Sequence, residues 1–240
     1  LLKYTKDYFV VPEEHIVVMK ADSITLYTMD GGVEEPKMLH VDWDTTAAQK
    51  GGYDFFMQKE IYDQPEALHN TIMPRIHNGH ADFSADNISD DIFKGVNRVI
   101  VTACGTAWHA GLVGRHLIEA MIRIPVTVEL ASEFRYMNPI LDEHTLVVVI
   151  TQSGETADSL AALREAKNHG VKTLAIVNAV GSSIAREADY VFYTLAGPEI
   201  SVATTKAYSA QLIAGYCLSM EFGRVRGQVD QEAYDEMLVE

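Results

Sequence analysis

Apolar and polar residues follow two kinds of pattern along this chain, and from residue 98 onward the two kinds alternate. Short apolar runs of strand length cover residues 98–103, 124–130, 145–151, 171–177 and 190–194. Segments of helical pattern lie between and after them, ending at about residues 122, 169, 187 and 222. Strands that alternate with helices of these lengths are typical of parallel sheets with helices on both faces. The sequence therefore predicts an α/β fold with a doubly wound, five-stranded parallel sheet.

The chain before residue 93 has a different character. Short β-rich runs cover residues 8–11, 15–19 and 23–29, and Asp30-Gly31-Gly32 supplies a turn in which glycine accepts a positive φ. A helical pattern then extends from about residue 53 to 76. It is interrupted at Asp63-Gln64-Pro65, where Asp63 can cap a helix and Pro65 can occupy its first turn. The sequence thus predicts a β-containing unit followed by a helical connector.

Domain limits follow from these changes of pattern. A polar interval over residues 77–91 indicates a boundary before the α/β domain. We predict a β-rich unit over 1–42, a mainly helical connector over 43–92, the main domain over 93–225, and the start of a linker over 226–240. The last segment has an amphipathic helical pattern. Because the chain also begins without Met, we expect it to be part of a longer protein.

Composition narrows the function classes. The 240 residues include 34 acidic and 19 basic side chains, so the formal net charge is −15 and a sequence-independent grip on nucleic acid is not expected. No apolar stretch approaches the length of a membrane span, and the first residues lack the zones of a signal peptide. Cys104 and Cys217 lie far apart without C-x-x-C spacing, which favours a reduced, cytoplasmic protein without disulfides.

Ligands of such sheets bind beyond the carboxyl ends of the strands, so the loops after Ala103, Thr151 and Thr194 are the candidate sites. The first two loops combine small residues with hydroxyls, which let backbone N–H groups approach a ligand and add further hydrogen bonds. Each also begins a helix, whose N-terminal N–H groups and dipole attract an anion. Residues 146–160 contain no Lys or Arg, so backbone and hydroxyl groups would hold a phosphate there.

Other roles for the same residues remain open. Ser and Thr before a helix are commonly plain caps, and for either loop alone capping is the more frequent role. Glu199 can contact a sugar hydroxyl or act as a base, although a carboxylate at a helix start is the commoner case. Cys104 can be an activated thiol, although packing behind a strand is more usual.

Spacing excludes several familiar motifs. The glycines after residue 104 do not form G-x-G-x-x-G, and no phosphate-binding G-x-x-x-x-G-K-S/T occurs. Thr151 stands where a nucleophile elbow needs its first glycine, which argues against a hydrolase. The histidines lack the spacing of a zinc site, so neither a metal nor another cofactor is predicted.

Four motifs, in order along the chain, resemble a known family. They are Cys104-Gly-Thr-Ala107, Ala131-Ser-Glu-Phe-Arg-Tyr136, Thr151-Gln-Ser-Gly-Glu-Thr-Ala-Asp158 and Glu199-Ile-Ser-Val-Ala-Thr-Thr-Lys206. They resemble the first sugar isomerase (SIS) domain of the isomerizing glutamine-fructose-6-phosphate aminotransferases, also called glucosamine-6-phosphate synthases. Met57-Gln-Lys-Glu-Ile-Tyr-Asp-Gln-Pro65 resembles the connector between the glutaminase and isomerase parts of that family. The resemblance implies a flavodoxin-like SIS fold.

The resemblance also implies a sugar-phosphate site. The family makes glucosamine 6-phosphate from fructose 6-phosphate and glutamine, in amino-sugar biosynthesis. Carried over position by position, the substrate contacts would come from Thr106, Ala107, Thr151, Gln152, Ser153, Thr156 and Val202. Two positions depart from the family pattern: Ala107 replaces a serine and removes one hydroxyl contact, whereas Thr151 often appears as serine and keeps one. The change at Ala107 bears on affinity more than on identity.

By the same resemblance, residues 1–42 correspond only to the end of a glutaminase domain, and 226–240 to the start of a linker to a second SIS domain. The family's ring-opening histidine, isomerization glutamate and C-terminal lysine would lie beyond Glu240, so no catalytic residue is assigned here. We expect weak binding of fructose 6-phosphate or glucosamine 6-phosphate without turnover, and pairing as a homodimer. The alternative is a non-catalytic SIS module for phosphosugar sensing or dimerization.

Overall fold

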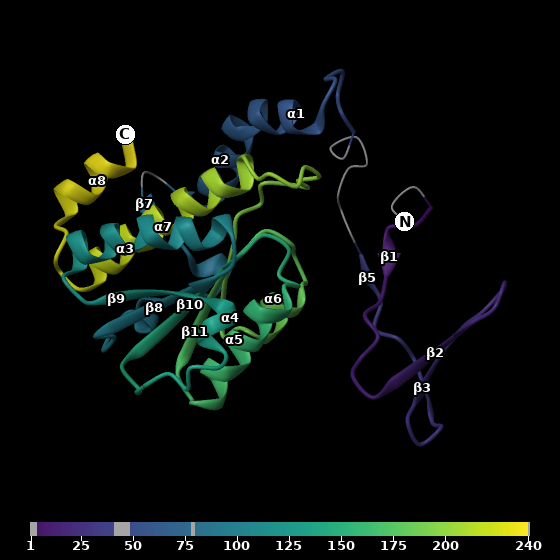
Figure 1. The fold of residues 1–240 in the computed structure, drawn as a ribbon. Helices are drawn as coiled ribbons and strands as arrows, with labels where there is room; N and C mark the ends of the chain where they lie inside the picture. The colour runs from purple at the N-terminus through teal and green to yellow at the C-terminus, as the bar shows by residue number, and fades with distance from the viewer. Residues whose placement is uncertain (1–3, 41–48, 78–79, 240) are drawn as a thin grey trace. The chain divides into compact units, whose positions relative to one another are not determined.

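The computed structural model describes residues 4–40, 49–77 and 80–239, which form two compact units divided in sequence at Gly51–Gly52 (Figure 1). The first unit consists of short strands. An antiparallel sheet contains β2 (His15–Met19), β3 (Ile24–Thr28) and β4 (Val33–Glu34), and a second antiparallel pair joins β1 (Asp7–Tyr8) to β5 (Leu39–His40). Gly31 turns the chain between β3 and β4 with a φ of 89°. The predicted glycine turn is therefore confirmed.

The second unit begins with the connector, which is helical as predicted. Its elements are α1 (Phe56–Tyr62), α2 (Gln64–Ile72) and the 3-10 turn η1 (Met73–Arg75), with Pro65 in the first turn of α2. Asp63 stands at the N-cap position of α2, but its side chain makes no cap hydrogen bond. The carboxylate pairs instead with Lys59 and Lys206. The predicted capping role of Asp63 is therefore wrong.

A five-stranded sheet forms the centre of the second unit. The strands lie in the order β12 (Tyr190–Tyr193), β11 (Lys172–Val177), β10 (Thr145–Thr151), β8 (Arg98–Ala103) and β9 (Val126–Leu130). Every neighbouring pair is parallel. This order and direction confirm the predicted doubly wound α/β fold.

Helices cover both faces of this sheet (Figure 1). One face carries α3 (Thr106–Ile122) and α7 (Lys206–Val225), and the other carries α4 (Ala131–Phe134), α5 (Ala157–Asn168) and α6 (Ser183–Glu187). Along β10, Val147 and Val149 pack in the core beneath α5, whereas Val148 and Ile150 pack in the core beneath α7. Burial on both faces explains the unbroken apolar run of this strand. Within the described ranges, no helix is both long and apolar enough to cross a membrane.

The polar interval over residues 77–91 does not separate the connector from the main domain. A hairpin of β6 (Ile76–His77) and β7 (His80–Ala81) leads into the 3-10 turns η2 (Ser84–Asp86) and η3 (Asp90–Ile92). Apolar side chains of this stretch are buried in the core beneath α7: Phe83, Ile88, Ile92 and the following Phe93. The polar residues surround these inserted side chains, so the described contacts run across the interval, and the domain limit expected at residue 93 stays a prediction. The limit expected after residue 42 concerns residues 41–48, which lie outside the described residues, and it stays a prediction.

The helical pattern expected after residue 226 is confirmed by α8 (Gln231–Val239). Tyr234 packs against Met220 and Val229, and its hydroxyl donates a hydrogen bond to Glu221 Oε2 at 2.9 Å. Burial, together with the Glu221 carboxylate, raises the pKa of Tyr234. These contacts join α8 to the far end of α7.

Arg75 ties the connector to the edge strand of the sheet. Its side chain is almost fully buried and donates to both carboxylate oxygens of Asp86, at 2.6 and 2.7 Å. It also donates to the backbone carbonyls of Thr71 and Tyr193, at 2.5 and 2.8 Å. The guanidinium carbon lies 3.7 Å from the centre of the Phe192 ring. One charged side chain, with a bidentate partner, thus joins α2, η2 and β12.

We expect Arg75→Ala to lower the free energy of unfolding by about 3–5 kcal/mol, because it leaves the Asp86 carboxylate buried without its partner. The matched control is Arg115→Ala, which removes a more exposed pair with Glu119 on α3. That variant should lose less than about 1 kcal/mol. Urea denaturation measures both values, and equal losses would contradict the role given to Arg75.

Candidate functional site

The candidate site lies where the order of the strands reverses. β8 pairs with β10 on one side and with β9 on the other, so the chain leaves β8 toward one edge of the sheet and leaves β10 toward the opposite edge. Parallel sheets form a crevice at such a point, just beyond the carboxyl ends of the strands. The two loops expected to bind an anion are the loops that flank this crevice.

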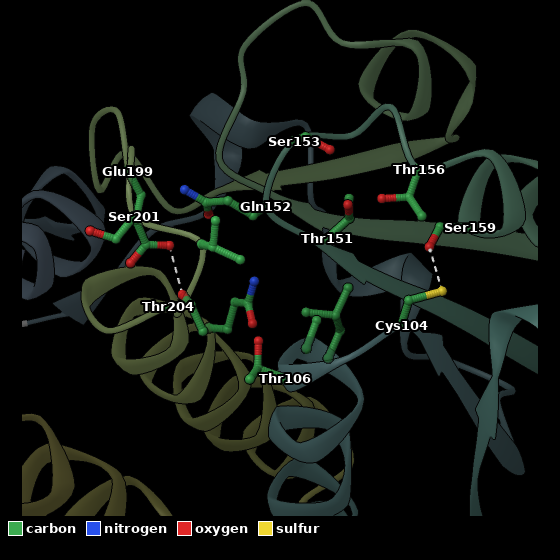
Figure 2. Close-up of a pocket in the computed structure, with 14 residues that line it drawn as sticks. Cys104, Thr106, Thr151, Gln152, Ser153, Thr156, Ser159, Glu199, Ser201 and Thr204 are labelled. Carbon is green, nitrogen blue, oxygen red and sulfur yellow. Dashed lines mark hydrogen bonds between the residues drawn. The ribbon is translucent and has the colours of Figure 1, made fainter. Parts of the chain in front are cut away.

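A cavity of about 250 Å³ occupies the crevice (Figure 2). All of the residues predicted to contact a sugar phosphate line it: Thr106, Ala107, Thr151, Gln152, Ser153, Thr156 and Val202. They come from three separate segments: after β8, from the last residue of β10 onward, and before α7. The grouping of these residues in one place is a finding, and the ligand of the cavity stays a prediction.

The first loop is shaped by Gly105, which has φ 58° and ψ −134°. Only glycine adopts this backbone conformation readily. α3 begins directly after it, and its first residues, Thr106 and Ala107, line the cavity. No side chain caps this helix start among the described residues. The first-turn N–H groups, which have no partner within the helix, thus begin at the cavity wall.

The second loop is held by its own hydroxyls. Gly154 N–H donates to Thr151 Oγ1 at 3.2 Å, and Glu155 N–H donates to Ser153 Oγ at 3.2 Å. Thr156 stands at the N-cap position of α5, yet its hydroxyl makes no cap hydrogen bond within the described chain. Plain capping therefore does not account for Thr156, whose side chain lines the cavity.

Gly154 is the tightest point of this loop. Its φ is 67°, and a Cβ at this position would lie 2.0 Å from Ser182 Oγ and 2.5 Å from Ser182 Cβ. Its carbonyl accepts a hydrogen bond from Ile184 N–H at 3.0 Å. The loop can therefore pack against the start of α6 only with glycine here.

Gln152 presents a polar side chain that the protein leaves unsatisfied. Its backbone carbonyl accepts hydrogen bonds from Asn178 and Ala179, at 3.3 and 3.2 Å. Its side-chain Oε1 is buried and has no hydrogen-bond partner in the described part of the chain. Buried amide oxygens normally have a partner. Because Gln152 lines the cavity, a bound hydroxyl could supply the hydrogen bond that Oε1 lacks.

Glu199 and Cys104 also line the cavity, but the structure gives each the commoner role. The Glu199 carboxylate accepts hydrogen bonds from Thr205 and Ala207 N–H, at 2.8 and 3.3 Å, and from the Thr204 hydroxyl at 2.6 Å. It therefore caps the start of α7. Cys104 packs against the core beneath α5, and its sulfur accepts a hydrogen bond from the Ser159 hydroxyl at 3.7 Å.

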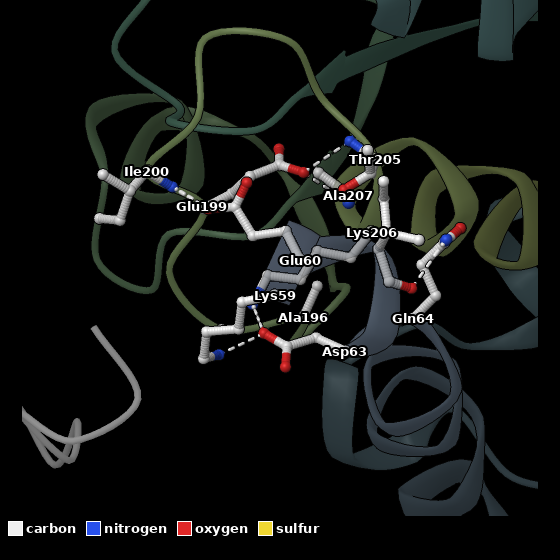
Figure 3. A network of polar contacts seen from close by, with 12 residues as sticks. Lys59, Glu60, Asp63, Gln64, Ala196, Glu199, Ile200, Thr205, Lys206 and Ala207 are labelled. Atoms are coloured by element: carbon white, nitrogen blue, oxygen red, sulfur yellow. Dashed lines mark hydrogen bonds and ion pairs between the residues drawn. The ribbon is translucent and has the colours of Figure 1, made fainter. Parts of the chain in front are cut away.

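The connector holds the third segment from outside the cavity (Figure 3). Glu60 Oε1 accepts hydrogen bonds from the N–H groups of Ile200 and Ser201. One turn further along, Asp63 Oδ2 lies 2.5 Å from Lys59 Nζ and 3.0 Å from Lys206 Nζ. Burial alone would raise the pKa of the Asp63 carboxyl, but the two lysines outweigh it and hold the pKa below its usual value. The connector is thus bonded to the middle of the segment that precedes α7 and to the first residue of α7.

Five further residues, which the sequence did not lead us to expect, also line the cavity: Ile150, Ser159, Ser201, Thr204 and Gln211. Gln211 is 4% exposed on α7. The sequence pattern could have indicated that Gln211 is buried, because Gln211 shares the helical periodicity of Ala207, Ala210 and Ala214, which are all buried. A polar residue on an apolar helix face points to a buried polar contact.

The site contains little charge of its own. None of the described residues that line the cavity is Lys or Arg. The described chain also holds no cluster of three or more His, Cys, Asp or Glu side chains placed to bind a metal ion. Helix N–H groups, hydroxyls and side-chain amides are therefore the groups that these residues offer to a ligand.

Residues 92–220 match the SIS domain family. Two relatives are isomerizing glutamine–fructose-6-phosphate aminotransferases. The protein from Clostridium tetani is 48% identical over 99% of this chain, and the protein from Caldanaerobacter subterraneus is 46% identical over the whole of it. This chain spans only 39% and 40% of the length of these relatives.

A solved structure shows the same fold. It is the C-terminal domain of glucosamine-fructose-6-phosphate aminotransferase from Francisella tularensis, with 36% identity and a TM-score of 0.77. The match covers 80% of this chain and 54% of that chain. The described α/β unit thus has a solved counterpart among the proteins that its sequence resembles.

We expect Gly154→Ala to lower the free energy of unfolding by well over 2 kcal/mol, because it adds a clash with Ser182 to the left-handed backbone cost of about 1–2 kcal/mol. Gly170→Ala is the matched control, since Gly170 has a similar φ of 73° and no atom within 4 Å of an added Cβ. Thermal and urea denaturation of both variants separate the clash from the backbone cost. Equal losses in the two variants would contradict the tight packing at Gly154.

The Asp63 pKa leads to a pH-dependent expectation. Because the folded pKa is lowered, the network adds stability above the unfolded value of about 4, and this stability is lost as the pH falls through the folded pKa. The free energies of unfolding of the wild type and Asp63→Asn should therefore differ most near neutral pH and converge below about pH 4. Denaturation across this range measures the gap, and a gap independent of pH would contradict the ion-pair origin of the stability.

Proposed function

We propose, because this chain belongs to the SIS domain family, that it is the sugar-phosphate-binding part of an isomerizing glutamine–fructose-6-phosphate aminotransferase. The whole enzyme would make glucosamine 6-phosphate from fructose 6-phosphate and glutamine. One observation carries the proposal: residues from three separate loops, each expected to contact a sugar phosphate, line one cavity. Identity of 48% to one such enzyme across 99% of this chain supports this choice within the family.

The phosphate group would be held at the starts of α3 and α5. Both helices are long enough for an N-terminal dipole, with 17 and 12 residues. The hydroxyls of Thr106, Ser153 and Thr156 add donors beside the backbone N–H groups. Because no cationic side chain lines the cavity among the described residues, binding by this chain would be modest.

The sugar would be held by the amides and by the third segment. Gln152 Oε1 lacks a hydrogen-bond partner in the described chain and can accept from a hydroxyl, and the Gln211 amide can both donate and accept. The Val202 side chain is fully exposed at the cavity, so its contribution would come from the backbone. Ala107 offers no hydroxyl, which would weaken binding further.

For these 240 residues we propose only that they bind the sugar phosphate. Glu199, the carboxylate that lines the cavity, already accepts three hydrogen bonds at the start of α7, and no catalytic residue is assigned to this chain. Turnover is proposed for the whole aminotransferase. The resemblance further supports a homodimer in the cytoplasm, and the formal charge of −15 argues against binding to nucleic acid.

Isothermal titration calorimetry of the 240-residue chain tests the proposal. We expect fructose 6-phosphate to bind and fructose to give no measurable heat, because the phosphate supplies the contacts to the helix starts. Thr156→Val should weaken fructose 6-phosphate binding about tenfold or more, since a hydrogen bond to a charged group contributes about 1.5–3 kcal/mol.

Thr127→Val is the matched control, because Thr127 is exposed on β9 and does not line the cavity. It should bind fructose 6-phosphate as the wild type does. Equal binding of fructose and fructose 6-phosphate, or the absence of binding by either, would contradict the proposed function.

A further inference from the structure

A buried carboxylate on the connector lies outside the cavity and yet bonds to a loop that lines it. Glu60 is on α1 and 2% exposed. Its Oε1 accepts hydrogen bonds from Ile200 N–H at 2.6 Å and from Ser201 N–H at 3.2 Å, across about 140 residues of sequence. Figure 3 shows this contact beside the Asp63–Lys206 pair. The second oxygen of the carboxylate, Oε2, is buried without a partner in the described chain.

Stability alone does not explain a charged residue at this position. Hydrogen bonds to a carboxylate are strong, but burying the charge and leaving one oxygen unsatisfied is costly. An apolar side chain of similar volume would avoid both costs. The structural gain specific to Glu60 is therefore the fixed orientation of two backbone N–H groups of the loop.

This orientation determines how the loop passes the cavity. A trans peptide points its N–H and its carbonyl in opposite directions. Because the N–H groups of Ile200 and Ser201 point at Glu60, the carbonyls of Glu199 and Ile200 point away from α1. Ser201 and its neighbour Val202 line the cavity, directly after the peptides that Glu60 holds.

The loop is fixed at two places along its course. Glu60 holds the backbone N–H groups of Ile200 and Ser201. After them, the Glu199 carboxylate caps α7, and Lys206 Nζ bonds to Asp63 on the connector at 3.0 Å. Both attachments to the connector come from one short stretch, Glu60 and Asp63.

We propose that Glu60 is a positioning residue for ligand binding: its buried carboxylate holds the backbone of Ile200 and Ser201 and thereby fixes the loop that completes the cavity. The inference rests on the proposed sugar-phosphate function. It assigns the connector a role in binding although none of the described connector residues lines the cavity. A displacement of α1 would move Ser201 and Val202 with it.

The test compares Glu60→Gln and Glu60→Ala with the wild type, in the 240-residue chain. Glu66→Gln is the matched control, because Glu66 is exposed on the next helix and the charge change is the same. Three quantities are measured: the amide hydrogen exchange rates of Ile200 and Ser201 without ligand, the affinity for fructose 6-phosphate, and the midpoint of thermal unfolding. Should Glu60→Ala fail to fold, Glu60→Gln alone decides.

We expect both amides to exchange at least about tenfold faster in Glu60→Ala and less so in Glu60→Gln, which keeps an acceptor without the charge. Fructose 6-phosphate affinity should fall about fivefold in Glu60→Gln and about tenfold or more in Glu60→Ala. The melting midpoint of Glu60→Gln should stay close to that of the wild type, which a merely structural role would not allow. Glu66→Gln should match the wild type in all three quantities.

Unchanged exchange at both amides would overturn the inference, and so would faster exchange with unchanged affinity. Absence of binding by the wild type is a different result, because it overturns the proposed function and the inference that rests on it. Normal binding by the wild type and equally by both Glu60 variants overturns the inference and leaves the proposed function standing.

Discussion

The cavity depends on one constraint, the parallel pairing of β8 with β10 while their connections leave toward opposite edges of the sheet. This pairing opens the crevice and brings the starts of α3 and α5 to it. The third segment arrives differently. It leaves β12, at the edge of the sheet, and has to pass the end of β11 to reach the cavity. No strand pairing within the described chain holds this segment at the cavity. Three carboxylates, Glu60, Glu199 and Asp63, bond to the segment or to the start of α7 instead.

Electrostatics act locally in this protein. A chain with a formal charge of −15 repels a phosphate dianion at long range, yet the carboxylates beside the cavity are held by local partners. Glu199 accepts three hydrogen bonds at the start of α7, and Asp158, in the first turn of α5, pairs with Arg135 at 2.8 Å. What remains at the crevice is the positive end of two helices. Such a field is short-ranged, so it favours an anion only at the helix starts themselves.

Sequence reasoning succeeded where burial is regular. The limits predicted for β8 and β10 match the structure, because strands buried on both faces read as unbroken apolar runs. It failed where a side chain has a distant partner. Nothing near Asp63 indicates that its carboxylate bonds to Lys206, and nothing near Glu60 indicates Ile200. Gln211 lies between these cases, since its buried helix face was visible in the sequence and its place at the cavity was not.

Contacts between residues distant in sequence also determine where the α/β unit begins. Composition suggested a start at residue 93, after a polar interval. Contacts place the connector in the same compact unit, which extends from Gly52. Arg75 bonds to β12, Phe83 packs in the core beneath α7, and Glu60 holds a loop of the cavity. Each of these three attachments reaches a different part of the sheet or its loops. The connector is therefore a structural part of the lobe that forms the cavity, because the third segment of the site has its anchor there.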